Sequence, residues 1–271
     1  MFSLVESGEY PVGWIKVVCD SEAQKLKRKI VCLTAYSKPI AKILDKYCDI
    51  ILVGDSLATA FYGMKSTKEI NLDTMINHGV SVSKSVKQSI LVFDMPFNTY
   101  RNLKEAKLNI QKVLKKTKCD AVKLESNGKN FDLLQKLVKS GVNVMGHIGY
   151  TPQYKKSFSP QGFNLNDEKK LLHEAIKIER AGAFAIVLEC INFKLAKKIT
   201  KKLKIPTIGI GSSFHCNGQI LVVDDLIGLS GFYPKFVKRY LNLNKIISNA
   251  IKKYKTEVIK KKFPKISNSY R

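Results

Sequence analysis

Short apolar runs rich in valine and isoleucine recur along the chain, and each is followed by a longer segment of helical spacing. Eight such runs are present: Ile30–Thr34, Ile50–Val53, Ile90–Phe93, Ala121–Leu124, Val142–Met145, Ala185–Leu188, Thr207–Ile210 and Leu226–Leu229. Their hydrophobicity is nearly continuous, which is typical of parallel strands that are covered on both faces. The pattern therefore predicts eight buried parallel strands.

Segments of helical period separate most of these runs. The helices predicted between them are Lys38–Lys46, Leu72–Ser85, Leu103–Thr117, Asp132–Ser140, Asp167–Ala181 and Phe193–Leu203. Eight strands that alternate with helices fit a closed α/β structure, the (β/α)8 or TIM barrel. An open doubly wound sheet is the alternative, but no GxGxxG motif opens the first helix. We therefore predict a TIM barrel.

Three segments follow from this assignment. We predict an N-terminal extension over residues 1–29, with a weak helical stretch from residue 21, a single barrel domain over residues 30–262, and a tail over residues 263–271. The last element predicted in the barrel domain is a basic helix from Leu243 to Lys262.

The sequence contains neither an apolar run long enough to span a membrane nor a signal-peptide pattern. Its six cysteines form no CxxC pair, which argues against a zinc or disulfide scaffold. We expect a cytoplasmic protein.

The net charge of the chain is +25, from 47 Lys plus Arg against 22 Asp plus Glu. Such an excess favours a nucleic-acid partner, because basic side chains displace counterions from phosphates. Few of these bases are arginine, however, although the guanidinium group is the better phosphate and base-edge ligand. The lysines are spread along the chain between apolar residues at helical spacing. We therefore interpret the charge as solvated helix faces and expect no nucleic-acid partner.

Chemically reactive side chains collect at the carboxyl ends of the predicted strands, where barrel active sites lie. They are Asp55 and Ser56 after the second run, Asp94 after the third, Lys123 and Glu125 on the fourth, His147 on the fifth and Glu189 on the sixth. Any one acid alone could be a helix N-cap or a rim ion pair. Four acids beside a lysine and a histidine predict an active site.

Carboxylates without thiolates suit a hard divalent cation such as Mg²⁺. A bound Mg²⁺ can hold a 2-oxo acid and stabilise the enolate that forms when a neighbouring C–H bond loses its proton. Asp55, Asp94 and Glu125 lie on consecutive strands and could share one ion. Lys123 could neutralise the substrate carboxylate. An acid that is not a ligand, such as Glu189, could act as the base.

The segments that carry this chemistry resemble the ketopantoate hydroxymethyltransferase (3-methyl-2-oxobutanoate hydroxymethyltransferase) family. The resemblance extends in order from residue 30 to residue 240 and rests on segments at 30–36, 52–57, 93–97, 122–125, 146–153, 187–190, 209–211, 217–222 and 234–237. It implies a barrel of the phosphoenolpyruvate/pyruvate superfamily, usually a homodecamer. It also implies Mg²⁺-dependent transfer of a hydroxymethyl group from 5,10-methylenetetrahydrofolate to 3-methyl-2-oxobutanoate, which yields 2-dehydropantoate for pantothenate and coenzyme A synthesis.

The resemblance also implies roles for single residues. The metal ligands fall on Asp55, Asp94 and Glu125, the proton acceptor falls on Glu189, and the substrate contacts fall on Asp55, Ser56, Asp94, Lys123 and His147. A helix N-cap remains an alternative for Ser56, and a packed histidine for His147. Cys190 is expected to be a buried apolar residue.

The chain departs from the family pattern mainly in the loops on the predicted folate side. The departures are Ala58, Tyr150, Phe163, Ser212, Ser213, Asn217, Asp224 and Asp225. Three alternatives stay open: a lyase or mutase of the same superfamily acting on another 2-oxo acid, a family member with impaired activity, and a barrel that binds nucleic acid or an anionic surface. The lyases and mutases typically carry a Lys-Lys-Cys-Gly-His loop, which this sequence lacks.

Overall fold

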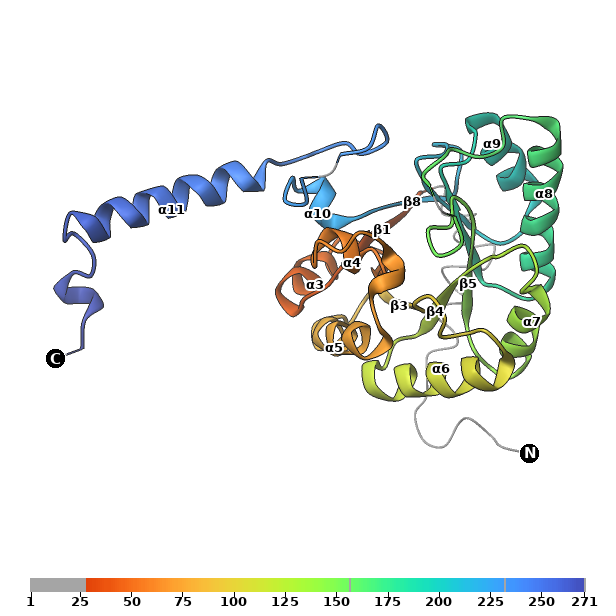
Figure 1. The fold of residues 1–271 in the computed structure, drawn as a ribbon, viewed down its shortest axis with the longest axis horizontal. Helices are drawn as coiled ribbons and strands as arrows, with labels where there is room; N and C mark the ends of the chain where they lie inside the picture. The colour runs from red at the N-terminus through yellow and green to blue at the C-terminus, as the bar shows by residue number, and fades with distance from the viewer. Residues whose placement is uncertain (1–27, 156, 232, 271) are drawn as a thin grey trace. The chain divides into compact units, whose positions relative to one another are not determined.

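The computed structural model describes residues 28–155, 157–231 and 233–270. Within these ranges eight parallel strands close into a barrel in sequence order, with β1 paired to β8 (Figure 1). The strands are β1 (Ile30–Thr34), β2 (Ile50–Val53), β3 (Ile90–Asp94), β4 (Ala121–Glu125), β5 (Val144–Gly149), β6 (Ala185–Glu189), β7 (Thr207–Ile210) and β8 (Gly218–Leu221). The predicted TIM barrel is confirmed.

Helices connect the strands from β1 to β7 and surround the barrel, whereas β7 passes to β8 through a loop (Figure 1). They are α3 (Lys38–Leu44), α4 (Leu57–Ala60), the 3₁₀ helix η1 (Thr67–Glu69), α5 (Leu72–Ser83), α6 (Leu103–Thr117), α7 (Phe131–Lys139), α8 (Leu165–Arg180) and α9 (Phe193–Lys202). The side chains of Asn102 and Asn164 each accept a hydrogen bond from the third backbone N–H of the helix that follows. This capping fixes where α6 and α8 begin.

One predicted strand is wrong. The run Leu226–Leu229 is not a strand, because Leu226 ends a short helix and Gly228 turns the chain at a φ of 74°. The eighth strand is Gly218–Leu221, which pairs with β1 and β7. Gln219 interrupts its hydrophobicity, and Gly218 is a residue that usually weakens strands. Here a Cβ atom at residue 218 would lie 2.7 Å from the carbonyl oxygen of Ile30, so only glycine lets β8 approach β1.

The fifth strand is displaced from its predicted position, Val142–Met145, and runs instead from Val144 to Gly149. Two glycines within this segment look like strand breakers in the sequence. Gly146 instead allows α8 to approach β5, because a Cβ atom there would lie 2.5 Å from Cγ2 of Ile178. The displacement places His147 inside the strand.

The barrel interior is filled by apolar side chains from alternate strand positions. This core consists of Ile30, Cys32, Ile50, Leu52, Ile90, Val92, Ala121, Met145, Ala185, Val187, Ile208 and Ile220. Among the described residues five cysteines are buried and carry free thiols. Cys190 is one of them, and burial raises the pKa of its thiol to about 12. Its predicted role as a buried apolar residue fits this environment.

The chain divides after Val222 into two compact units, whereas the sequence predicts one domain over residues 30–262. The unit from Val223 onward contains α10 (Val223–Leu226), α11 (Leu243–Ile259) and η2 (Ile266–Asn268). The predicted basic helix is thus present but ends at Ile259. The predicted helical stretch from residue 21 lies almost wholly outside the described residues. No described helix is long and apolar enough to cross a membrane.

Candidate active site

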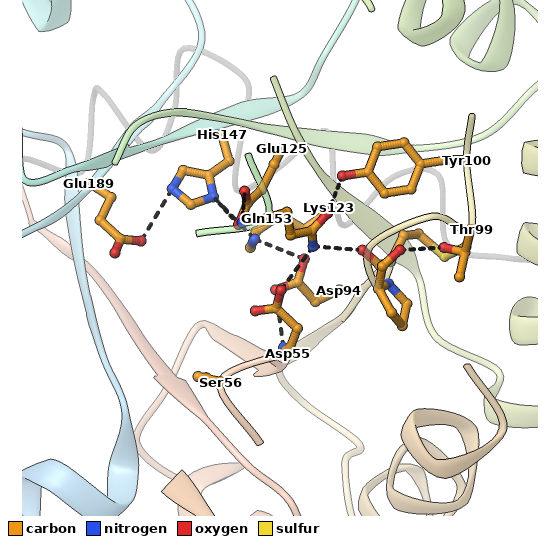
Figure 2. Close-up of polar contacts among 12 residues, drawn as sticks. Asp55, Ser56, Asp94, Thr99, Tyr100, Lys123, Glu125, His147, Gln153 and Glu189 are labelled. Carbon is orange, nitrogen blue, oxygen red and sulfur yellow. Dashed lines mark hydrogen bonds and ion pairs between the residues drawn. The ribbon is translucent and has the colours of Figure 1, made fainter. Parts of the chain in front are cut away.

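The inward-facing positions of four neighbouring strands change from apolar to ionisable at their carboxyl ends. Side chains on a strand alternate between faces, so a residue two positions beyond a core residue also faces the interior. This spacing relates Val92 to Asp94, Ala121 to Lys123 and then Glu125, Met145 to His147, and Val187 to Glu189. Together with Asp55 they form the rim cluster: Asp55, Asp94, Lys123, Glu125, His147 and Glu189 (Figure 2). The structure thus brings together the acids, lysine and histidine selected from the sequence.

Lys123 lies at the centre of the rim cluster. Its Nζ atom lies 2.8 Å from Oδ1 of Asp94, and both side chains are almost fully buried. Burial by itself lowers the pKa of Lys123, but the charges of Asp94, Asp55 and Glu125 outweigh it and hold that pKa above its ordinary value. The lysine is therefore a permanent buried cation, available to an anionic substrate.

His147 connects Lys123 to Glu189. Its Nδ1 atom lies 3.2 Å from Nζ of Lys123, and its Nε2 atom lies 3.2 Å from Oε2 of Glu189 (Figure 2). Burial, and then the charge of Lys123, lower the pKa of His147 well below its ordinary value, so the ring is neutral. An ammonium group can only donate, so Nδ1 accepts and the ring proton lies on Nε2, facing Glu189.

Glu189 is the member of the rim cluster that is open to solvent, with 18% of its side chain exposed. Burial raises the pKa of its carboxyl group to about 8, and the charge of Asp55 adds to the effect while Lys123 opposes it. A carboxylate with a pKa near the working pH is well suited to accept and return a proton.

The acids provide oxygen ligands of the kind that Mg²⁺ prefers. The backbone N–H of Asp55 donates to Oδ2 of Asp94 at 3.2 Å, which holds these two acids side by side. Oε1 of Glu125 is buried and accepts no hydrogen bond. The described residues contain no group of three His, Cys, Asp or Glu side chains that could hold a metal ion. The pair Asp55 and Asp94 nevertheless fits Mg²⁺, which commonly binds one or two carboxylates and keeps several waters.

Gln153 is a site residue to which the sequence analysis assigns no role. It is fully buried in the loop after β5, and its Nε2 donates to Oδ2 of Asp55 at 2.8 Å and to the carbonyl oxygen of Met95 at 3.0 Å. Its Oε1 accepts from the hydroxyl of Tyr100, and its backbone N–H donates to Oε2 of Glu125 at 3.0 Å (Figure 2). Gln153 therefore orients two acids at once.

Replacing Gln153 with leucine is expected to lower the free energy of unfolding by about 2–4 kcal/mol, because Asp55, Met95 and Tyr100 lose their buried partner. Denaturant titration measures this change. The matched control Tyr100→Phe removes one hydrogen bond of the same network and should cost only about 1 kcal/mol. Equal losses in the two variants would contradict a central role for the amide.

Ser56 lies at the N-cap position of α4, but its side chain forms no capping hydrogen bond. Its hydroxyl group instead forms a hydrogen bond with the hydroxyl group of Tyr36 at 2.8 Å.

Two residues that depart from the family pattern form local hydrogen bonds. Oγ of Ser212 donates to the carbonyl oxygen of Leu188, and Oδ1 of Asn217 accepts from the backbone N–H of Thr207. Phe163 is 69% exposed. These residues adjust the loops and leave the rim cluster intact.

A closed parallel barrel with buried acids, a lysine and a histidine at its carboxyl end defines a (β/α)8-barrel enzyme. Its fold is similar to that of phosphoenolpyruvate phosphomutase from Streptomyces platensis subsp. rosaceus, with a TM-score of 0.59, 11% identity, and coverage of 88% of this chain and 86% of that one. It is also similar to that of a 2,3-dimethylmalate lyase of the PEP mutase/isocitrate lyase superfamily, with a TM-score of 0.56, 11% identity, and coverage of 90% and 86%. These similarities support the barrel fold.

The chain belongs to the ketopantoate hydroxymethyltransferase family, whose model matches residues 17–266. It is 51% identical over 247 residues to the 3-methyl-2-oxobutanoate hydroxymethyltransferase of Pelagibacter ubique (strain HTCC1062), covering 91% of this chain and 96% of that protein. It is 46% identical over 253 residues to the enzyme of the same name from Bartonella tribocorum, covering 92% and 93%. The family predicted from the sequence is confirmed.

Proposed function

We propose that this enzyme transfers a hydroxymethyl group from 5,10-methylenetetrahydrofolate to 3-methyl-2-oxobutanoate, giving 2-dehydropantoate for pantothenate synthesis. The observation that carries the proposal is the buried row from Asp94 through Lys123 and His147 to Glu189, with contacts of 2.8, 3.2 and 3.2 Å. This row offers a fixed cation for a 2-oxo acid and a carboxylate base at its solvent-facing end. The names of the curated relatives support the same activity.

Asp55 and Asp94 would hold a Mg²⁺ ion, and Glu125 would contact it directly or through water. When bound, the ion supplies positive charge that polarises the oxygens of a 2-oxo acid. Lys123 binds the substrate carboxylate, and the hydroxyl of Ser56 donates to it. These contacts fix the substrate so that its C3–H bond faces Glu189.

Glu189 accepts the C3 proton, and the electron pair of the broken C–H bond delocalises onto the C2 oxygen. Nε2 of His147, 3.2 Å from Oε2 of Glu189, helps to hold the carboxylate in position. The C3 carbon then forms a bond to the methylene carbon of the folate as the first of its two carbon–nitrogen bonds breaks and that nitrogen takes up a proton. Water displaces the second nitrogen from the same carbon and supplies the hydroxyl oxygen of the product. The proton lost from this water goes to the second nitrogen, and tetrahydrofolate is released. A decameric assembly and a cytoplasmic location accompany this proposal as predictions.

The test separates proton removal from one-carbon transfer. In deuterated water with Mg²⁺ and without folate, the enzyme is expected to exchange the C3 proton of 3-methyl-2-oxobutanoate, as followed by NMR. With 5,10-methylenetetrahydrofolate it is expected to form 2-dehydropantoate, and removal of divalent cations with a chelator should stop both reactions. Absence of exchange and of product in the presence of Mg²⁺ would refute the proposed function.

A further inference from the structure

A cavity of about 280 Å³ lies beside the rim cluster, between the loops that follow β4 and β5 and the first half of α8. Its lining is mainly polar and includes Glu174, Lys155 and Lys170. The mechanism above uses none of these three residues. The cavity needs a separate explanation.

Glu174 is a buried carboxylate that forms no hydrogen bond or ion pair with the described residues, although the charges of Lys170, Lys155, His173 and Lys177 act on it. The residue is 8% exposed, and no donor in the described part of the chain forms a hydrogen bond or an ion pair with it. A Cβ atom at Gly128 would lie 3.4 Å from its Oε1, so the carboxylate extends from α8 to the loop after β4. Burying a carboxylate without donors costs free energy, which a ligand that donates hydrogen bonds would recover.

The inner wall of this cavity is formed by the strand ends that carry the rim cluster. Ser126, which lines the cavity, directly follows Glu125, and its backbone N–H donates to the carbonyl oxygen of His147 at 2.9 Å. Gly149, also in the lining, is paired in register with Glu189. A ligand in the cavity therefore lies next to the strands that present the proton acceptor.

The chemistry of the lining selects among ligands. An inorganic anion would be attracted by Lys155 and Lys170 but repelled by the charge of Glu174. A 2-amino-4-oxopyrimidine ring presents two neighbouring N–H donors, at N3 and at the 2-amino group, which one carboxylate can accept in a bidentate manner. The same ring presents an oxygen at C4 that a lysine ammonium can contact. The volume is at the lower end for small-molecule sites and suits a bicyclic head without its tail.

We propose that this cavity binds the pteridine head of the folate co-substrate and that Glu174 recognises its N3–H and 2-amino group, with Lys155 or Lys170 at the C4 oxygen. The inference rests on the proposed function, since it concerns the one-carbon donor of the same reaction. Glu174 is thus a binding residue for the co-substrate alone.

The experiment compares Glu174→Gln with wild type in tetrahydrofolate binding, measured by calorimetry, and in C3 proton exchange without folate. Because glutamine cannot accept both hydrogen bonds, the dissociation constant for tetrahydrofolate and the KM for its methylene form are expected to rise about 10- to 100-fold. The exchange rate and the KM for the 2-oxo acid should stay within about 2-fold, since the rim cluster is unchanged. Glu168→Gln is the matched control, because Glu168 lies on the same helix, pairs with Lys198 at 3.8 Å and is absent from the cavity lining.

A folate analogue with a methyl group in place of the 2-amino group tests the assignment on the wild-type protein. Wild type should bind it more weakly than tetrahydrofolate by a similar factor, and Glu174→Gln should bind the two ligands about equally. The inference is overturned if wild type does not distinguish them, or if Glu174→Gln binds tetrahydrofolate as tightly as wild type. Loss of C3 exchange in wild type would instead count against the proposed function itself.

Discussion

Glu189→Gln is expected to slow exchange of the C3 proton, and with it formation of 2-dehydropantoate, by about 10²- to 10⁴-fold, the range for loss of a general base. The amide keeps the shape of the side chain and its contact with His147, but it cannot accept the proton. NMR of the substrate in deuterated water measures the exchange directly. Glu105→Gln is the control, because the side chain of Glu105 pairs with the exposed Arg101 and does not belong to the rim cluster.

The pH dependence of the same reaction follows from the environment of Glu189. Burial raises the pKa of this carboxyl group to about 8, so the basic form accumulates as the pH rises through that value. The value of kcat/KM for exchange should therefore increase with pH and level off above about 8 in wild type. The pH profile of Glu189→Gln should lack this rise, and an unchanged profile would contradict the assignment.

The contribution of Glu189 to stability should fall as the pH rises, whereas the exchange activity should increase. A carboxyl group with a raised folded-state pKa binds more protons in the native state than in the unfolded state between its two pKa values, so it lowers stability as the pH rises through that window. For Glu189 the window extends from its ordinary value of 4.5 to about 8. Glu189→Gln should thus be at least as stable as wild type at pH 8. Its loss of activity cannot then be attributed to unfolding.

Lys123→Met is the second change with a large expected effect. Methionine fills a similar volume but leaves Asp94 without its cation, and removing one partner of a buried ion pair typically costs about 3–5 kcal/mol of stability. Lys123 also supplies the charge for the substrate carboxylate, so the KM for the 2-oxo acid should rise by about 100-fold or more. Denaturant titration and steady-state kinetics measure the two effects separately.

The double variant Lys123→Met/Asp94→Asn distinguishes the structural effect from the chemical one. Removing the charge of Asp94 together with that of Lys123 should restore a large part of the free energy of unfolding, because no unpaired buried charge remains. Activity should not recover, since the proposed substrate-binding charge of Lys123 and the proposed metal ligand Asp94 are both lost. Recovery of activity with stability would show that Lys123 acts only on folding.

The order of strands and helices could be predicted because each carries a local signal. Seven of the eight apolar runs overlap real strands, and the helix Leu103–Thr117 has its predicted limits. The eighth strand was predicted at the wrong place, because the segment Leu226–Leu229 is more hydrophobic than the actual strand Gly218–Leu221. Gly218 is required by its distance from the neighbouring strand β1, which no local pattern records.

The rim cluster could be predicted for a related reason. Strand ends in a parallel barrel converge on one rim, so Asp94, Lys123 and Glu189 meet although they are far apart in sequence. Gln153 and Glu174 were missed, since one lies in a loop and the other in the middle of a charged helix. Gln153 is recognised only by its contact with Asp55, and the proposed role of Glu174 rests on the lack of a hydrogen-bond donor to it among the described residues. The sequence also could not reveal that Nζ of Lys123 donates a hydrogen bond to Nδ1 of His147, which places the ring proton on Nε2.

The change from apolar to ionisable side chains within the barrel interior takes place over two residues on each of four neighbouring strands, β3 to β6. Below that level the interior contributes to folding, and above it the interior contributes to reactivity. Substitutions at the upper level can therefore alter chemistry while the lower level continues to specify the same architecture. This separation makes the barrel evolvable: a new reaction requires a new set of rim side chains, and the folding problem does not have to be solved again.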